Sequence, residues 1–340
     1  MASDPFTKRA IQILFHVNAE PRKQIAFSLA FLWLGLAVVI ALADRAPLHL
    51  QTLYPQAEIG SSFYDYIEGV VERTLPGPFV YRVLVPYAYT FTRHFGFDLL
   101  LVDFAVKVGL LWLCHLVFFR YLRRFVPGLA AVAGVFLLDV LVAYSLSYIS
   151  GSSAVETMDL VNLLVFVLAL AWIHADRLPA LCVVLAVGTL NRETVWLLVF
   201  IFALRDWLEG RGLRRLVWPG LAVAVPYFGV RLLVPSDAVW FGTKDLVYNI
   251  PFLRAETTWQ AVLANTHVFF LLAPLIWLAA IRFREHPRFL QIAATMTPVF
   301  ILVHYVFGSI IERRLWMPLY VLLIPLVVRR LQGWFGGERE

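Results

Sequence analysis

Two acidic residues beyond the first long apolar stretch are placed where one of them could act as a general base. Asp65 and Glu68 lie in segment 62–75, whose apolar residues recur at helical spacing. Tyr64 and Tyr66 flank Asp65, and a carboxylate in aromatic and apolar surroundings can take a proton from a hydroxyl group. The solvated acidic face of an amphipathic helix explains the same pattern, so both interpretations stay open.

Three polar residues, Asn191, Arg192 and Glu193, separate two short apolar runs, 178–190 and 194–204. Helices interrupted in this way face a cavity rather than lipid, and the backbone amides at a helix start attract anions such as phosphate. The sequence therefore predicts a site for a charged ligand here. The alternative is a plain helix connection in which Arg192 and Glu193 pair with each other.

Further arginines occur where apolar surroundings make them costly. Arg82 lies deep in an apolar run, and Glu312, Arg313 and Arg314 precede the last one. Because a guanidinium group contacts phosphate with two parallel hydrogen bonds, we expect these residues to hold a phosphate; Arg82 could instead pair with Asp65 or Glu68. His304, in the preceding apolar run, belongs to the same candidate site. The alternatives are arginines that snorkel at the membrane surface and a plain buried histidine.

The composition shows what must position these side chains. Of the 340 residues 61% are hydrophobic and only 15% charged, whereas soluble domains carry about 25% charged residues. Soluble enzymes, disordered chains and coiled coils are thereby excluded. The net charge of +6 is spread between apolar runs, which argues against a nucleic-acid partner. Cys114 and Cys182 lie inside apolar runs and offer neither a disulfide framework nor a metal site.

We therefore predict an all-α polytopic membrane protein with about ten transmembrane helices. A span needs about 20 largely apolar residues. Eight candidate spans are 25–43, 99–119, 129–146, 160–175, 216–234, 260–281, 289–307 and 315–328, and the two short runs 178–190 and 194–204 complete the set. The first span is expected to be an uncleaved signal anchor. With both termini cytoplasmic, most basic residues fall in the inside loops.

The chain is expected to form one transmembrane domain, 25–330, between a cytoplasmic N-terminal segment, 1–24, and a cytoplasmic tail, 331–340. Two long external loops cover residues 44–98 and 235–259. The first should carry two helices in the membrane interface: the amphipathic one described above, and a more apolar one, half sunk beside the bundle. Within the spans, Asp103 and Lys107 are four residues apart and are expected to pair.

This layout resembles the GT-C superfamily of polytopic membrane glycosyltransferases. The shared features are one anchoring span, a large first external loop with acidic residues on interface helices, and a bundle of many spans. Segments 63–66, 80–86, 191–194 and 312–318 look like parts of uncharacterised bacterial membrane proteins related to that group. The chain departs from many members in having Asp44 alone where they have an acidic pair, and in lacking a large C-terminal soluble domain.

The resemblance implies that a carboxylate of the first external loop is the catalytic base of an inverting hexosyl or pentosyl transfer. Asp65, Glu68 and Glu58 are the candidates. The donor would be a polyprenyl-phosphate sugar, and the acceptor would be met on the external, periplasmic face of the plasma (inner) membrane. Arg82, Arg192 and Arg313 or Arg314 would hold the departing lipid phosphate. No cofactor is required, although a divalent cation is compatible with the pattern.

Two other functions remain open. A transporter or lipid flippase would use the intramembrane Asp103, Lys107 and Asp139, but the sequence shows no internal repeat that relates two halves. A non-catalytic membrane scaffold would leave the external charged groups without a shared purpose. Protein partners are not indicated by any segment.

Overall fold

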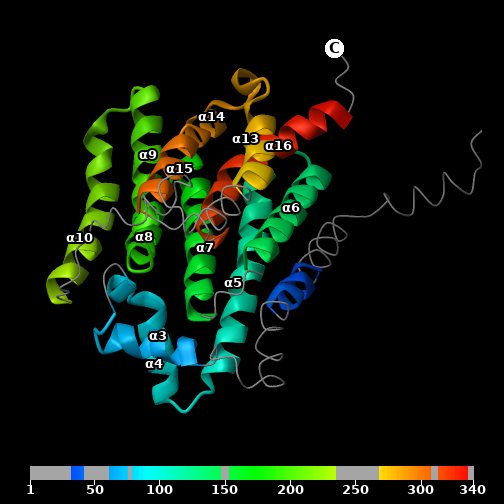
Figure 1. The fold of residues 1–340 in the computed structure, drawn as a ribbon. Coiled ribbons are helices and arrows are strands. Elements are labelled where there is room, and N and C mark those ends of the chain that lie inside the picture. Colours follow the sequence, from blue (N-terminus) through cyan, green and yellow to red (C-terminus); the bar gives the residue numbers. More distant parts are fainter. Residues whose placement is uncertain are drawn as a thin grey trace, which may run out of the picture.

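Every described element of the computed structural model is a helix (Figure 1). The structure describes residues 32–41, 61–75, 79–146, 153–234, 268–307 and 313–335. No strand occurs among these residues, so the predicted all-α class is confirmed for them.

Six helices in the described part of the chain are long and apolar enough to cross a membrane, which indicates a membrane-embedded protein. They comprise α5 (Leu99–Leu122), α6 (Gly128–Leu146), α7 (Ser153–His174), η3 (Leu213–Leu216) continuing into α10 (Val217–Leu233), α14 (Arg288–Ala294) followed by α15 (Thr297–Phe307), and η7 (Arg313–Trp316) continuing into α16 (Met317–Phe335). The remaining candidates are shorter: Leu32–Ala41, α8 (Leu178–Thr189), α9 (Trp196–Leu208), and η5 (Val268–Leu272) with α13 (Ala273–Ala280). Ten crossings therefore stay a prediction.

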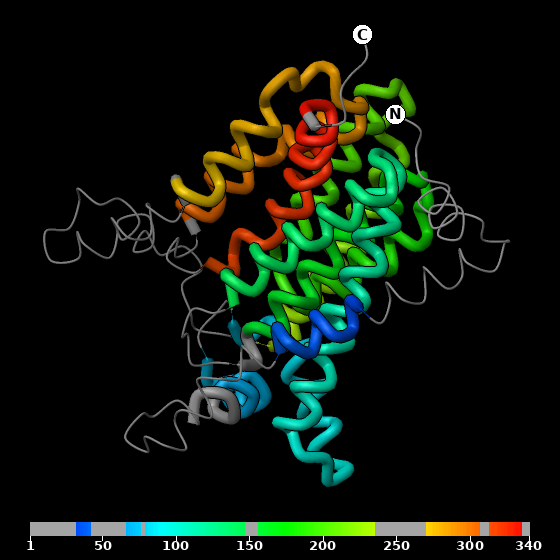
Figure 2. Tube along the Cα trace, turned by 90° about the vertical axis from the view of Figure 1, so that its right-hand side faces the viewer, coloured from blue at the N-terminus to red at the C-terminus, as the bar shows by residue number. Residues whose placement is uncertain are grey.

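The centre of the bundle is formed by α7 and α16, whose most apolar stretches are 72% and 78% buried. Residues 163–173 of α7 and 319–328 of α16 are apolar or aromatic on all sides, as expected of helices surrounded by others. The segment Leu32–Ala41 packs beside α5 (Figure 2), where the Trp33 ring lies 4.9 Å from that of Phe119.

The short helices α8 and α9 are joined by a turn at the end of the bundle that faces α3 (Ser61–Val71) and η1 (Phe79–Tyr81) (Figure 1), where the Leu84 amide donates a hydrogen bond of 3.1 Å to the Leu190 carbonyl. They have 12 and 13 residues, or about 18–20 Å each against a hydrocarbon core of about 30 Å. At Gly188, α8 packs closely against α7. A Cβ atom at this position would lie only 2.7 Å from the Val165 side chain, so the close approach requires glycine. Asn191 and Arg192 in the turn are buried. Two short helices separated by a polar turn are therefore present as predicted, while the depth of this turn in a membrane stays a prediction.

The segment predicted as the first external loop contributes α3 (Ser61–Val71), η1 (Phe79–Tyr81) and α4 (Leu84–His94), which lie together beyond one end of the bundle (Figures 1 and 2). They are joined to the bundle by a hydrophobic cluster of Ile67, Val85, Tyr89, Leu99 and Met158. The outer side of this region exposes the aromatic side chains of Tyr87, Phe91, Phe95 and Phe97, a composition typical of a membrane interface. Residues 79–94 form a short 3-10 helix and an 11-residue α-helix instead of the single helix predicted. This length agrees with the prediction that the segment does not cross the membrane.

The opposite end of the bundle carries a network of charges. Asp176, in the turn between α7 and α8, accepts hydrogen bonds from Arg205 (2.9 Å) on α9 and Arg215 (2.7 Å) on η3. Although burial works the other way, these hydrogen bonds lower the pKa of Asp176 to about 2. The carboxylate therefore stays ionised and ties three helix ends together.

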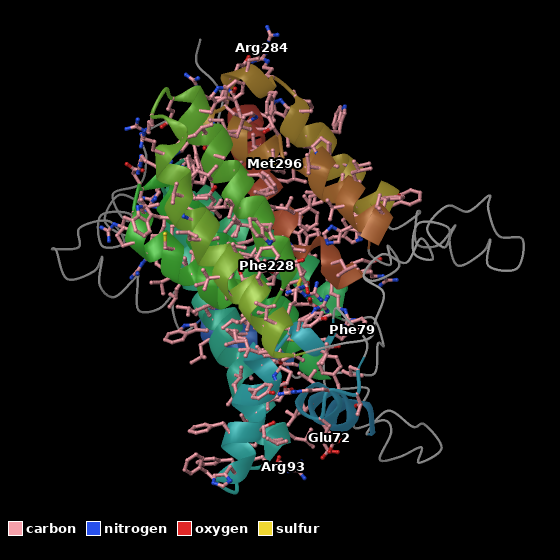
Figure 3. All side chains as sticks on the ribbon, turned by 90° about the vertical axis from the view of Figure 1, so that its left-hand side faces the viewer. Glu72, Phe79, Arg93, Phe228, Arg284 and Met296 are labelled. Atoms are coloured by element: carbon pink, nitrogen blue, oxygen red, sulfur yellow. The ribbon has the colours of Figure 1, made fainter. Side chains whose placement is uncertain are left out.

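The basic turns assigned to the inside by sequence lie at this same end. Arg288 at the start of α14 donates a hydrogen bond of 2.6 Å to the Leu208 carbonyl at the end of α9. Figure 3 places Arg284 at this end, and Glu72 and Arg93 at the other. The separation of the two ends agrees with the predicted loop arrangement, while the side that faces the cytoplasm stays a prediction.

Candidate functional site

Four arginines from distant parts of the sequence meet two carboxylates where the first external loop touches the bundle. We call this group the arginine cluster. It consists of Arg82, which follows η1; Arg192 and Glu193 at η2 (Glu193–Val195); Asp159 on α7; Arg231 on α10; and Arg314 on η7.

The inner half of the arginine cluster is built on Asp159. Its side chain is 1% exposed, and its two oxygens lie 2.5 Å from Arg192 Nη2 and 3.3 Å from Arg314 Nε. An ionised carboxylate is costly to bury unless such partners compensate it. Asp159 therefore fixes the positions of two guanidinium groups that belong to α8–α9 and to the start of the last span.

The outer half of the arginine cluster is built on Glu193, which is 27% exposed. Its oxygens lie 3.7 Å from Arg82 Nη2 and 3.4 Å from Arg231 Nη2. The Arg231 guanidinium also lies 3.6 Å from the ring centre of Tyr227 and 4.4 Å from that of Tyr81. Such cation–π contacts help to hold the guanidinium group in place.

Tyr66 on α3 faces both halves of the arginine cluster. Burial raises the pKa of this phenol, while the positive charges of Arg82 and Arg192 work against the rise. Its hydroxyl group lies 3.8 Å from the Met158 sulfur. Helix α3 therefore covers the arginine cluster on the side away from the bundle.

Several polar atoms beside the arginine cluster can still accept or donate. The Asn191 side chain is buried and donates to the Met158 carbonyl (2.8 Å). Its Oδ1 atom, like Arg82 Nε, has no hydrogen-bond partner among the described residues. Because buried polar atoms are normally paired, these atoms mark a place for water or a polar ligand. Thr194 Oγ1 donates to Asn162 Oδ1 (3.2 Å) on the adjoining wall.

The charge balance favours an anionic ligand. The arginine cluster combines four positive and two negative side chains, and its members come from five separate elements or turns. In a partly buried place such an excess attracts a phosphate group and stabilises negative charge that develops there.

The alternative in which Arg192 and Glu193 pair with each other is wrong. Arg192 has an extended backbone, with φ −154° and ψ 145°, and side chains of successive residues in extended backbone point in opposite directions. Arg192 therefore reaches Asp159, and Glu193 reaches Arg82 and Arg231.

The two proposed catalytic carboxylates are placed differently. Glu68 pairs with the exposed Arg93 at 2.9 Å, and lies on the face of α3 away from Tyr66 because two helical positions are about 200° apart. It does not join the arginine cluster. The backbone of Asp65 lies in α3, one residue before Tyr66, whereas its side chain, like Glu58 and Glu312, lies outside the described residues.

Arg313 and His304 lie against aromatic rings near the arginine cluster. The Arg313 guanidinium is 4.5 Å from the Tyr144 ring on α6, so only its neighbour Arg314 contacts Asp159. The His304 ring stacks 4.1 Å from that of Phe300, as the alternative of a plain buried histidine predicts.

Sequence reasoning missed Asp159 and Arg231. Asp159 directly precedes the predicted span 160–175, and Arg231 lies near the end of the predicted span 216–234. Neither residue was therefore considered as part of a site. An acidic residue directly bordering a long apolar run is the signal that could have identified Asp159, because ionisable residues at membrane depth need partners.

A second charged group lies between α5 and α7. Lys107 Nζ is 3.4 Å from Asp103 and 3.0 Å from Glu156, so the predicted pair of Asp103 and Lys107 is confirmed. The hydroxyl groups of Tyr89 and Thr157 each donate to Asp103 at 2.7 Å. The side chains of this network are all buried, and they join α4, α5 and α7 to one another: Tyr89, Asp103, Lys107, Glu156 and Thr157.

No group of three histidine, cysteine or acidic side chains in the described ranges could hold a metal ion. Comparisons with protein-family models, curated proteins and solved structures give no match for this chain. Its function must therefore be inferred from the side chains that meet at the arginine cluster.

Proposed function

We propose that this protein is a membrane glycosyltransferase of GT-C type, which transfers a sugar from a polyprenyl-phosphate donor to an acceptor on the external face of the inner membrane. The observation that carries the proposal is the meeting of Arg82, Arg192, Arg231 and Arg314 at the edge of the membrane-embedded bundle. A lipid-linked phosphate would arrive at this depth, with its chain in the bilayer and its sugar toward water.

In the proposed reaction, the acceptor hydroxyl attacks the anomeric carbon and the bond from that carbon to the phosphate oxygen breaks. A carboxylate takes the proton of the hydroxyl group, and the lipid phosphate leaves with the bonding electron pair. Arg82 and Arg231 on the more exposed side would neutralise the growing charge on the phosphate, which is where preorganised donors contribute most.

Asp65 is the proposed base, because its helix also carries Tyr66, which covers the arginine cluster. Glu68 is kept as the second candidate although it pairs with Arg93, since substrate binding could change an exposed ion pair. Asp159 is less suited, because two arginines hold its carboxylate in the charged form.

Purified protein incubated with a panel of polyprenyl-phosphate sugars and acceptor lipids tests the proposal. The rate should fall at least about a hundredfold in Asp65→Asn and about a hundred- to a thousandfold in Arg82→Gln. Glu72→Gln and Arg73→Gln, which alter exposed residues at the same end, serve as matched controls. Equal turnover by Asp65→Asn and wild type would remove Asp65 as the base, and equal turnover by Arg82→Gln would remove the phosphate clamp.

The alternative of a transporter or lipid flippase is favoured by the buried charges of Lys107, Asp103 and Glu156. It predicts movement of a fluorescent polyprenyl phosphate across proteoliposome membranes with no sugar released. Sugar transfer in detergent, where no second membrane face exists, would decide against this alternative.

A further inference from the structure

A hollow of about 530 Å³ lies at the end of the bundle opposite the arginine cluster. Three separate segments line it: the turn after α5, the turn between α13 and α14, and the last part of α16. Figure 1 shows α13, α14 and α16 meeting at this end. We call this hollow the basic pocket.

The lining of the basic pocket is strongly positive. Glu285 is the one carboxylate among the described lining residues, and it lies 3.5 Å from Arg282 and 4.0 Å from Arg330. The arginines that line it are Arg123, Arg124, Arg282, Arg329 and Arg330. One glutamate cannot balance five guanidinium groups, so an anion in the hollow would relieve their mutual repulsion.

Three of these guanidinium groups are oriented by the protein itself. Arg124 donates to the Ala171 carbonyl (2.8 Å), and Arg329 donates to the Phe125 carbonyl (3.2 Å). Arg330 lies over the Trp334 ring at 5.1 Å. Side chains held in this way lose little entropy when a ligand binds, which favours affinity.

A buried histidine supplies a second and independent observation. His286 lines the basic pocket and is 6% exposed, yet neither of its ring nitrogens has a hydrogen-bond partner among the described residues. Burial, and then the charges of Arg329 and Arg330, lower the pKa of His286. The neutral ring therefore offers one donor and one acceptor to whatever occupies the hollow.

We propose that the basic pocket binds a ligand bearing one or two phosphate groups. Its volume lies within the range of small-molecule sites, and each planar guanidinium group of its lining can donate two hydrogen bonds to a pair of phosphate oxygens. Two sources supply this chemistry: the head group of an anionic phospholipid, for which basic pockets between membrane helices are known sites, and a soluble phosphorylated molecule. The site is separate from the arginine cluster and does not depend on the proposed transfer reaction.

The test measures the unfolding temperature of the purified full chain in a neutral detergent. In one arm phosphatidylglycerol is titrated, with phosphatidylcholine as the uncharged comparison, and in the other arm inorganic pyrophosphate is titrated. Wild type should show a saturable rise in unfolding temperature with at least one of the two probes. A rise with the lipid alone identifies the membrane source, and a rise with pyrophosphate identifies a soluble one.

Variants locate the binding. Arg282→Gln should weaken the apparent affinity at least about tenfold, the usual effect of losing a charge-assisted hydrogen bond. Arg284→Gln is the matched control, because Arg284 lies in the same turn but outside the lining of the hollow. Arg123→Gln, at an exposed position of another turn, gives the same test should Arg282→Gln fold poorly. No saturable response in wild type, or equal losses in Arg282→Gln and Arg284→Gln, would overturn the proposal.

Discussion

Replacing Asp159 by asparagine should remove the carboxylate that two arginines share. The change keeps the shape of the side chain but removes the negative charge shared by Arg192 and Arg314. Arg192 is 3% exposed and cannot turn to water without moving the α8–α9 turn. Breaking a buried ion pair by removing one partner costs about 3–5 kcal/mol, so Asp159→Asn should lose that much free energy of unfolding.

An exposed ion pair in the same part of the molecule provides the comparison. Glu68 and Arg93 are 49% and 57% exposed, and such a pair contributes at most about 1 kcal/mol. Glu68→Gln should therefore lower the free energy of unfolding by about 1 kcal/mol or less. The assay is unfolding of the purified chain in mixed micelles by a denaturing detergent, followed by circular dichroism.

A double variant separates loss of charge from loss of packing. In Asp159→Asn with Arg192→Gln the buried cation is absent, so the combined cost should be smaller than the sum of the two single costs. A cost for Asp159→Asn no larger than that for Glu68→Gln, or simple additivity in the double variant, would refute the buried ion pair as described.

Three further predictions concern packing, pH and the buried charges. Gly134→Ala should cost about 1–3 kcal/mol, since its Cβ would lie 2.7 Å from the Leu122 side chain, whereas Gly109→Ala, with nothing within 4 Å, should leave the melting temperature unchanged or raise it. Because the folded-state pKa of Asp176 is lowered from 3.8 to about 2, its stabilising contribution should be complete above pH 4 and lost as the pH falls toward 2, so melting temperatures measured across this range should vary less in Asp176→Asn. Lys107→Met should cost about 3–5 kcal/mol in the same detergent titration, because it leaves two buried carboxylates without their cation; a loss below about 1 kcal/mol would contradict the buried network.

Much of the helical framework could be predicted because it depends on local composition. Apolar runs of sufficient length identified the long spans, and the polar residues from Asn191 to Glu193 identified the break between α8 and α9. The amphipathic spacing of residues 62–75 likewise predicted a helix, and α3 covers most of that range.

The pairing of the charged side chains could not be predicted in the same way. The sequence left open whether Arg192 pairs with its neighbour Glu193 or binds a charged ligand. In the structure Arg192 contacts Asp159 on α7, and that contact depends on how α7 and α8 are rotated against each other. The same holds for Arg231, whose place between Tyr81 and Tyr227 requires the first external loop to lie against the end of α10. The spacing of apolar residues along the sequence determines neither the rotation of α7 against α8 nor the placement of the loop against α10.

The buried turn between α8 and α9 has a consequence for how the protein is made. Neither α8 nor α9 is long enough by itself to cross the hydrocarbon core as an independent segment, and a buried arginine in the turn between them needs a compensating negative charge. The carboxylate that contacts it, Asp159, is on the helix synthesised just before it. We therefore expect α7, α8 and α9 to leave the insertion machinery together as one unit.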